Sequence, residues 1–262
     1  MLHRSIFRFI LAAIAALIMV TPVFAGGWAV VTLDALPAQV IAGQPIQTGF
    51  TVRQHGRTLR DDLVPIIRLE RADKKDSFTV TAKRQGASGH YVATLTFPSA
   101  GTWDWKIDIE QFGMITQPMP ELTVLAAAPA NDGRVAAASS PRAPATSLPA
   151  FLAALLRWFE TARAANNASS AAPSGPAHLG RDLFLAKGCV MCHRHDAVRE
   201  ARQAMNYFEG IGPDLTHRKL DADYLRRWLN NPSAIKKGTQ MPTLGLSGEE
   251  IEALIAFLGA SE

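Results

Sequence analysis

Cys189-Val190-Met191-Cys192-His193 is the stretch that decides the fold of the carboxy-terminal part of this chain. It contains two thiols separated by two residues and followed at once by an imidazole. Covalent haem attachment requires this spacing, because each thiol adds to one haem vinyl group and the adjacent His then binds the iron. The stretch therefore predicts a c-type haem site with His193 as the proximal ligand.

Other interpretations of the cysteine pair are a redox dithiol, a disulfide and part of a zinc site. Cys189 and Cys192 are the only cysteines in the 262 residues, so a zinc site of four thiolates cannot form within one chain. Dithiol chemistry does not require His193. We therefore expect one covalent haem c.

The amino terminus predicts export. Arg4 and Arg8 give a basic start, residues 9–20 are apolar, and Ala25 is a small residue suited to signal peptidase. This order is typical of a signal peptide over residues 1–25. An uncleaved anchor is the alternative, since the apolar stretch approaches membrane-spanning length. We expect cleavage, and a location in the periplasm or at the outer face of the cytoplasmic membrane, because haem is attached to apocytochromes outside the bacterial cytoplasm.

Because basic and acidic residues are evenly balanced, we do not expect a nucleic-acid partner. The formal net charge is +4, and residues 26–126 and 178–262 each contain equal numbers of basic and acidic residues. Neither range resembles the basic stripe of a nucleic-acid-binding protein. The length is enough for two modest domains with hydrophobic cores.

Residues 127–177 are rich in Ala, Pro, Ser and Asn, a composition that cannot bury a core and is typical of a linker. A short amphipathic helix is expected within it over residues 150–164, where Phe151, Leu155 and Phe159 recur at helical spacing. This helix could contact a membrane surface, or it could pack on one of the chain's own domains.

Residues 26–126 predict an all-β domain. Apolar and polar residues alternate along residues 91–97 and 103–109, which predicts two strands with one buried face, paired as a β-hairpin around Gly101. Further strands are expected over residues 28–33, 46–53, 65–70, 77–84 and 122–125. Short strands at this density predict an immunoglobulin-like sandwich. The run from Gly89 to Trp103 resembles the closing hairpin of small exported sandwich modules of the YtkA-like type.

The soft or borderline metal ligands of this domain are His55, His90, Met114 and Met119, and a copper site of imidazole and thioether is conceivable. Their spacing is not that of a ligand set. We therefore expect a binding or docking module, with metal trafficking as a minor alternative.

Residues 178–262 predict an all-α domain. A helix is expected around Gly180, whose missing side chain lets another helix approach closely. A second is expected at the end of the chain, where Ser247 and Glu250 form a capping box ahead of apolar residues at helical spacing. A third is expected over residues 221–229. Crossing of the first and last helices would close a core large enough for haem.

A low-spin haem needs a second axial ligand, and the candidates downstream of His193 are His195, Met205, His217 and Met241. His195 is too close to the attachment site to reach the opposite haem face. Met205 lies where the chain must turn around the haem edge. Met241 is 48 residues beyond His193, in a segment that can reach that face. His217 is the runner-up.

The order of these features resembles class I cytochrome c. The attachment motif is followed by Gly212-Pro213-Asp214-Leu215, by Met241-Pro242 and by a terminal amphipathic helix, over about residues 178–261. The resemblance implies that the Pro213 carbonyl accepts a hydrogen bond from the His193 ring. It also implies that the first and last helices cross at Gly180, Phe184 and Phe257.

Residues 212–258 also look like the cytochrome c domain fused to subunit II of caa-type oxidases, in which a β-sandwich precedes the haem domain. Two observations separate this chain from that subunit. No cysteine remains for its dinuclear copper centre, and one apolar segment stands where the subunit has a transmembrane hairpin. We interpret the chain as an electron shuttle with a comparable haem module.

Ligation by His193 and Met241 predicts an electron carrier rather than an enzyme. Thioether sulfur favours ferrous over ferric iron, and two filled axial positions leave no place for a substrate. We expect single electrons to pass through the haem edge beside the thioethers to redox proteins, such as a terminal oxidase or a membrane dehydrogenase. The alternative is a haem-based gas sensor or a small catalytic cytochrome in which Met241 dissociates.

Overall fold

The computed structural model describes residues 27–112, 116–127, 175–198 and 211–259. The expected signal peptide and the expected helix over residues 150–164 lie outside the described residues, as do Met114 and Met205. Within the described ranges, no helix combines the length and the apolar character that crossing a membrane requires.

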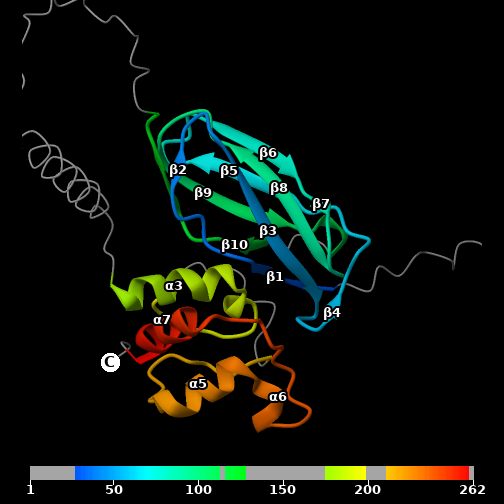
Figure 1. The fold of residues 1–262 in the computed structure, drawn as a ribbon, viewed down its shortest axis with the longest axis vertical. Coiled ribbons are helices and arrows are strands. Elements are labelled where there is room, and N and C mark those ends of the chain that lie inside the picture. The colour runs from blue at the N-terminus through cyan, green and yellow to red at the C-terminus, as the bar shows by residue number, and fades with distance from the viewer. Residues whose placement is uncertain (1–26, 113–115, 128–174, 199–210, 260–262) are drawn as a thin grey trace, which may run out of the picture.

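The amino-terminal domain is an immunoglobulin-like sandwich of two sheets (Figure 1). The first sheet has the order β1-β3-β8-β7, with β4 paired to β3, and the second has the order β2-β11-β9-β5-β6, with β10 paired to β9. The strands of the first sheet are β1 (Ala29–Leu33), β3 (Pro45–Gln54), β4 (Thr58–Leu59), β7 (Lys83–Arg84) and β8 (His90–Thr96). Those of the second are β2 (Val40–Ile41), β5 (Ile66–Arg71), β6 (Ser77–Thr81), β9 (Gly101–Asp108), β10 (Thr116–Pro118) and β11 (Leu122–Leu125).

Aromatic side chains fill the space between the two sheets. The rings of Phe78, Phe97 and Trp103 meet edge to face, with centroids 5.3 to 5.6 Å apart. Such pairs add about 0.5–1.5 kcal/mol each to the stability gained from burial alone. The one-face burial predicted for β9 is confirmed, because Trp103, Trp105 and Ile107 are buried.

The predicted hairpin of residues 91–97 with residues 103–109 is wrong. β8 pairs with β3 and β7, whereas β9 pairs with β5, β10 and β11, so the two strands lie in opposite sheets. Alternation of apolar and polar residues shows that a strand has one buried face. The same alternation occurs in two strands that pair within one sheet and in two strands that face each other across a core. Pro98, which has no N–H to donate, lies in the connection between the sheets.

The single strand predicted over residues 77–84 is likewise divided. β6 pairs with β5 in the second sheet, and β7 pairs with β8 in the first. Ala82, between them, is buried. The short strands β2, β4 and β10 were not expected, because two or three residues carry no periodicity.

The carboxy-terminal domain is all-α. Its elements are α3 (Pro176–Ala186), the 3₁₀ turn η2 (Cys189–Met191), α5 (Ala222–Asn230), α6 (Pro232–Ile235) and α7 (Gly248–Gly259). A further 3₁₀ turn, η1 (Glu110–Phe112), belongs to the sandwich. The three helices expected from the sequence are confirmed, and α6 is an additional single turn.

The crossing of α3 and α7 depends on Gly180. A Cβ there would collide with the carbonyl oxygen of Ala253 and would lie 2.6 Å from Cβ of Phe257. The rings of Phe184 and Phe257 meet beside it, with centroids 5.6 Å apart. The crossing implied by the resemblance is therefore present.

The predicted capping box of α7 is confirmed. The Ser247 amide donates to Glu250 Oε2 at 3.0 Å, and the Glu250 amide donates to Ser247 Oγ at 3.2 Å. α5 begins in a similar way, since the Asp221 carboxylate accepts from the Tyr224 amide at 2.7 Å. These caps satisfy amides that the first turn of a helix leaves unpaired.

The two domains pack directly on each other. Figure 1 shows β1 and β10 on the side of the sandwich that faces α3, with α7 next and α5 and α6 farther away. Val30 of β1 is buried in the hydrophobic core of the helical domain. Ala186 of α3 is buried in that of the sandwich. The hydrophobic cores are therefore continuous across the boundary.

Candidate haem site

The attachment motif follows α3 through a glycine in the left-handed region. Gly188 has φ +78°, and a Cβ there would lie 2.8 Å from the carbonyl oxygen of Val31. Glycine is favoured at such a position because other residues are strained at positive φ. The turn starts η2 at Cys189 and places both cysteines at a cavity.

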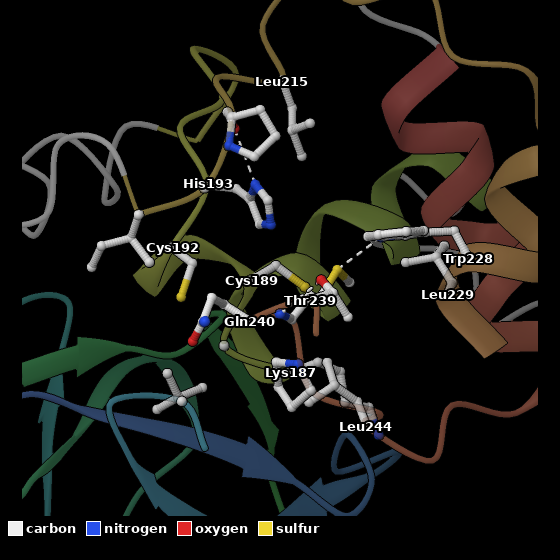
Figure 2. A pocket seen from close by; sticks show the side chains of 18 of the residues that line it. Lys187, Cys189, Cys192, His193, Leu215, Trp228, Leu229, Thr239, Gln240 and Leu244 are labelled. Atoms are coloured by element: carbon white, nitrogen blue, oxygen red, sulfur yellow. Dashed lines mark hydrogen bonds between the residues drawn. The ribbon is translucent and has the colours of Figure 1, made fainter. Parts of the chain in front are cut away.

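This cavity has a volume of about 1240 Å³ and is lined by both domains. Cys189, Cys192, His193 and Met241 all line it, and Figure 2 shows the sulfurs of the two cysteines near the His193 ring. The helical domain contributes several leucines to the wall, namely Leu225, Leu229, Leu254 and Leu258. An apolar cavity with two thiols and an imidazole at its rim fits a flat, covalently attached ring system.

His193 is oriented by Pro213. Its Nδ1 lies 3.0 Å from the Pro213 carbonyl oxygen, so the tautomer with hydrogen on Nδ1 donates this bond and leaves Nε2 toward the cavity (Figure 2). Burial lowers the pKa of His193, while the bond to Pro213 opposes that shift. Burial, the larger of the two effects, thus favours a neutral imidazole. The bond to Pro213 selects the tautomer whose Nε2 keeps a lone pair for iron.

Gly212 makes room for that imidazole. A Cβ on Gly212 would lie 2.7 Å from His193 Nδ1. The Gly212 amide donates to the Cys192 carbonyl oxygen at 3.0 Å. The chain beside Pro213 is thus pressed against the His193 ring. The hydrogen bond that the resemblance to class I cytochrome c implies is present.

Met241 enters the cavity from the segment between α6 and α7. Trp228 Nε1 donates to Met241 Sδ at 3.0 Å, which is the dashed line from Trp228 in Figure 2. The Met241 amide donates to Thr239 Oγ1 at 3.2 Å. The sulfur is therefore held by an indole N–H, a contact that the sequence alone did not indicate.

The other candidate axial ligands lie elsewhere. His195 is 1% exposed and packs on Phe257, with ring centroids 4.4 Å apart, outside the cavity lining. His217 is exposed and does not line the cavity. Among the described candidates, Met241 alone shares the cavity with His193.

The two thiols are poor nucleophiles in this setting. Burial raises the pKa of Cys189 to about 12 and that of Cys192 to about 11. A redox dithiol needs a lowered pKa and an electropositive surrounding. The raised pKa values therefore argue against dithiol chemistry.

The candidate copper ligands occupy separate environments. His55 packs near Trp28 at the cavity, with ring centroids 5.9 Å apart. The His90 ring bonds the Gln85 carbonyl and the Asp34 carboxylate, and Met119 is buried in the sandwich core. The described part of the chain holds no cluster of three or more His, Cys, Asp or Glu side chains that suits a metal ion.

Sequence reasoning missed the part of the cavity wall that comes from the sandwich. Trp28, Val30, His55 and Arg57 all line the cavity. They precede the cysteines by more than a hundred residues, and no periodicity or motif links them to a haem site.

This fold and this site define a class of protein, namely a haem protein with a covalently bound cofactor and a helical core closed by crossed terminal helices. Residues 177–261 match the model of the cytochrome c family. The carboxy-terminal domain is therefore a class I c-type cytochrome domain. Its cofactor is one covalent haem c, and the protein is a haem c electron-transfer protein with an immunoglobulin-like sandwich in front of that domain.

Solved structures with some likeness to this chain include the Lin-41 filamin domain, at 11% identity and a TM-score of 0.28, covering 36% of this chain and 90% of that one. Superoxide reductase (neelaredoxin) from Ignicoccus hospitalis matches at 15% identity and a TM-score of 0.26, covering 40% of this chain and 89% of that one. Likeness at this level says nothing about function. No curated protein matches the chain.

Proposed function

We propose that the protein is an exported electron carrier in which His193 and Met241 are the two axial ligands of the haem iron. The observation that carries the proposal is that both side chains line one cavity, together with the two cysteines, although Met241 is 48 positions beyond His193 in the sequence. A thioether ligand stabilises ferrous iron and fills the remaining axial position.

The residues of the site have distinct tasks in this proposal. When bound, haem c supplies the one-electron ferric/ferrous couple. Cys189 and Cys192 would hold it covalently, and the Pro213 carbonyl holds the His193 ring in one orientation. The leucines of the cavity wall exclude water, which disfavours the more highly charged ferric state. The Trp228 N–H draws electron density from Met241 Sδ, which acts in the same direction.

Export is supported by the signal-peptide pattern of residues 1–25 and by the need to attach haem outside the cytoplasm. We place the protein in the periplasm or at the outer face of the cytoplasmic membrane. Its partners would be redox proteins, a terminal oxidase or a membrane dehydrogenase among them. Lys236 and Lys237, exposed beside the Met241 segment, are suited to such transient encounters.

A haem-based gas sensor is the second candidate, and one observation favours it. The segment from Lys236 to Leu246 has no regular secondary structure and is largely exposed, and its hydrogen bonds at Met241 are those to Thr239 and Trp228. A ligand held in this way could leave the iron when a gas binds.

The absorption spectrum of the purified protein, with carbon monoxide added to the ferrous form, decides between the two candidates. We expect a low-spin spectrum that carbon monoxide does not change, and prompt carbon monoxide binding in Met241→Leu. Met119→Leu, a matched change in the sandwich core, should behave as the wild type. Prompt binding by the wild type would contradict the electron-carrier proposal and favour the sensor.

A further inference from the structure

The residues directly before Cys189 are held by the sandwich rather than by the helical domain alone. Lys187 is 3% exposed, and its Nζ donates to the backbone carbonyls of Leu33 at 3.0 Å and Asp34 at 3.1 Å. It also forms an ion pair with Glu250 Oε1 at 2.8 Å. A buried ammonium is stable only when it is paired and hydrogen-bonded, so the end of β1, the attachment segment and the start of α7 must keep this arrangement.

Gln117 of β10 forms a second link. It is 2% exposed, and its Oε1 accepts from the Val31 amide at 2.9 Å. Its Nε2 donates to the carbonyl oxygens of Val31 at 2.8 Å and Leu185 at 3.0 Å. One side chain therefore joins β10 of one sheet to β1 of the other and to the last turn of α3.

The position of β1 at the edge of its sheet explains why Gln117 bonds to it. β1 lies at the edge of its sheet and pairs with β3 on one side, so the Val31 amide would otherwise have no backbone partner on the other side. Edge strands carry unpaired donors and acceptors that must be covered. Here Gln117 and α3 cover them.

The sandwich also reaches the cavity itself. Val30 packs in the same core as Cys189 and Cys192, and Trp28 lines the cavity beside it. Arg57, in the turn between β3 and β4, donates to Gln240 Oε1 at 2.6 Å, next to Met241. β1 therefore packs beside the two cysteines.

We infer that the sandwich is a fixed wall of the haem site, that Gln117 and Lys187 are the positioning residues that hold it there, and that it shields the cysteine side of the cavity from water and from redox partners. The inference goes beyond the proposed function. It rests on haem c at Cys189 and Cys192 and does not depend on which residue is the sixth ligand.

Gln117→Glu tests the inference with almost no change in size. A carboxylate keeps an acceptor for the Val31 amide but faces the carbonyl oxygens of Val31 and Leu185 without a hydrogen to donate. Gln47→Glu, on an exposed position of β3, introduces the same charge as a control. The readouts are hydrogen exchange of the Val31 amide, the reduction potential of the holoprotein, and its rate of reduction by a small neutral reductant.

We expect Gln117→Glu to speed exchange of the Val31 amide, to lower the reduction potential and to raise the rate of reduction several-fold, because water and the reductant then reach the cysteine side. Gln47→Glu should change none of the three. Unaltered exchange and potential in Gln117→Glu would overturn the inference.

The wild type gives an independent decision if Gln117→Glu does not fold. Slow exchange of the Val31 amide, comparable to that of paired central strands, supports the inference. Exchange as fast as that of an exposed edge amide overturns it. Neither result depends on the carbon monoxide experiment, so failure of the inference and failure of the proposed ligation remain distinguishable.

Discussion

The two sides of the haem cavity are built differently. On the cysteine side, the chain passes from α3 into η2 and makes buried contacts with the sandwich. The side-chain amide of Gln117 forms three hydrogen bonds there, and Lys187 is paired with Glu250. On the methionine side, Met241 lies in a segment without regular structure, where Arg57 and Gln240 meet at an exposed position. Buried, fully bonded groups resist local opening, and exposed segments with few apolar contacts open at low free-energy cost.

This difference separates two properties of the protein. The cysteine side determines whether the haem is attached and whether the domains stay together. The methionine side determines the sixth ligand, and it can change without disturbing the fold. Variants on the first side should therefore affect haem attachment, stability and the access of water to the haem, and variants on the second side should affect the sixth ligand and the spectrum.

The largest effect is expected from removing both thiols. The double variant Cys189→Ala/Cys192→Ala should carry no haem that survives denaturation, because no thioether can form. Haem staining after denaturing electrophoresis measures this. Met241→Leu, on the other side of the cavity, should keep its covalent haem. Covalent haem in the double variant would contradict the assignment of the attachment site.

The next effect concerns the crossing that supports the cysteine side. Gly180→Ala introduces a methyl group against Ala253 and Phe257, and overpacking of this kind costs about 1–3 kcal/mol of unfolding free energy. Thermal unfolding should show a clearly lower Tm. Gly248→Ala is the matched control, because beyond its chain neighbours and the backbone of its own helix no atom lies within 4 Å of the added Cβ. Equal Tm values for the two variants would show that the helices do not cross closely at Gly180.

A smaller effect is expected on the methionine side from Trp228→Phe. This variant keeps an aromatic ring but deletes the N–H that donates to Met241 Sδ. The sulfur then donates more electron density to the iron, so the reduction potential should fall while the spectrum stays low-spin. Tyr224→Phe, in the ring stacked on Trp228, serves as the control and should leave the potential unchanged. A higher potential in Trp228→Phe would contradict the assigned role of this bond.

The smallest effect is a pH dependence at the end of β1. The Asp34 carboxylate, 2.8 Å from His90 Nε2, raises the pKa of His90. The folded protein thus holds this proton to higher pH than the unfolded chain, whose His pKa is about 6.5. The added stability is complete below that value and is lost as pH rises through the raised folded pKa.

Because the pair is partly exposed, this contribution is below about 1 kcal/mol. Denaturant unfolding on both sides of neutral pH measures it, in the wild type and in Asp34→Asn. The variant keeps the backbone carbonyl that Lys187 uses but loses the carboxylate. A pH dependence that is the same in both proteins would assign it to another group.

Local signals account for what the sequence could predict. The capping box of Ser247 and Glu250 and the close-packed Gly180 each depend on residues near in sequence or on one small side chain. The haem motif is equally local. The resemblance to class I cytochrome c then indicated Pro213 and Met241 as two more residues of the site.

Contacts between distant segments could not be predicted. Alternation showed that β8 and β9 each have a buried face, but it could not show that they lie in opposite sheets. Gln117 and Leu185 are 68 residues apart, and neither residue type indicates a partner. Trp28 and Arg57 line the haem cavity because of how the domains pack, which no motif in either domain specifies.

The most direct test of the central claim is X-ray absorption at the iron edge of the holoprotein, in the ferric and ferrous states. The account predicts one sulfur among the atoms bound to iron in both states, supplied by Met241, with nitrogen at the other positions. The sulfur should be lost in Met241→Leu and kept in Gln117→Glu. An iron bound by nitrogen or oxygen alone in the wild type would contradict the account.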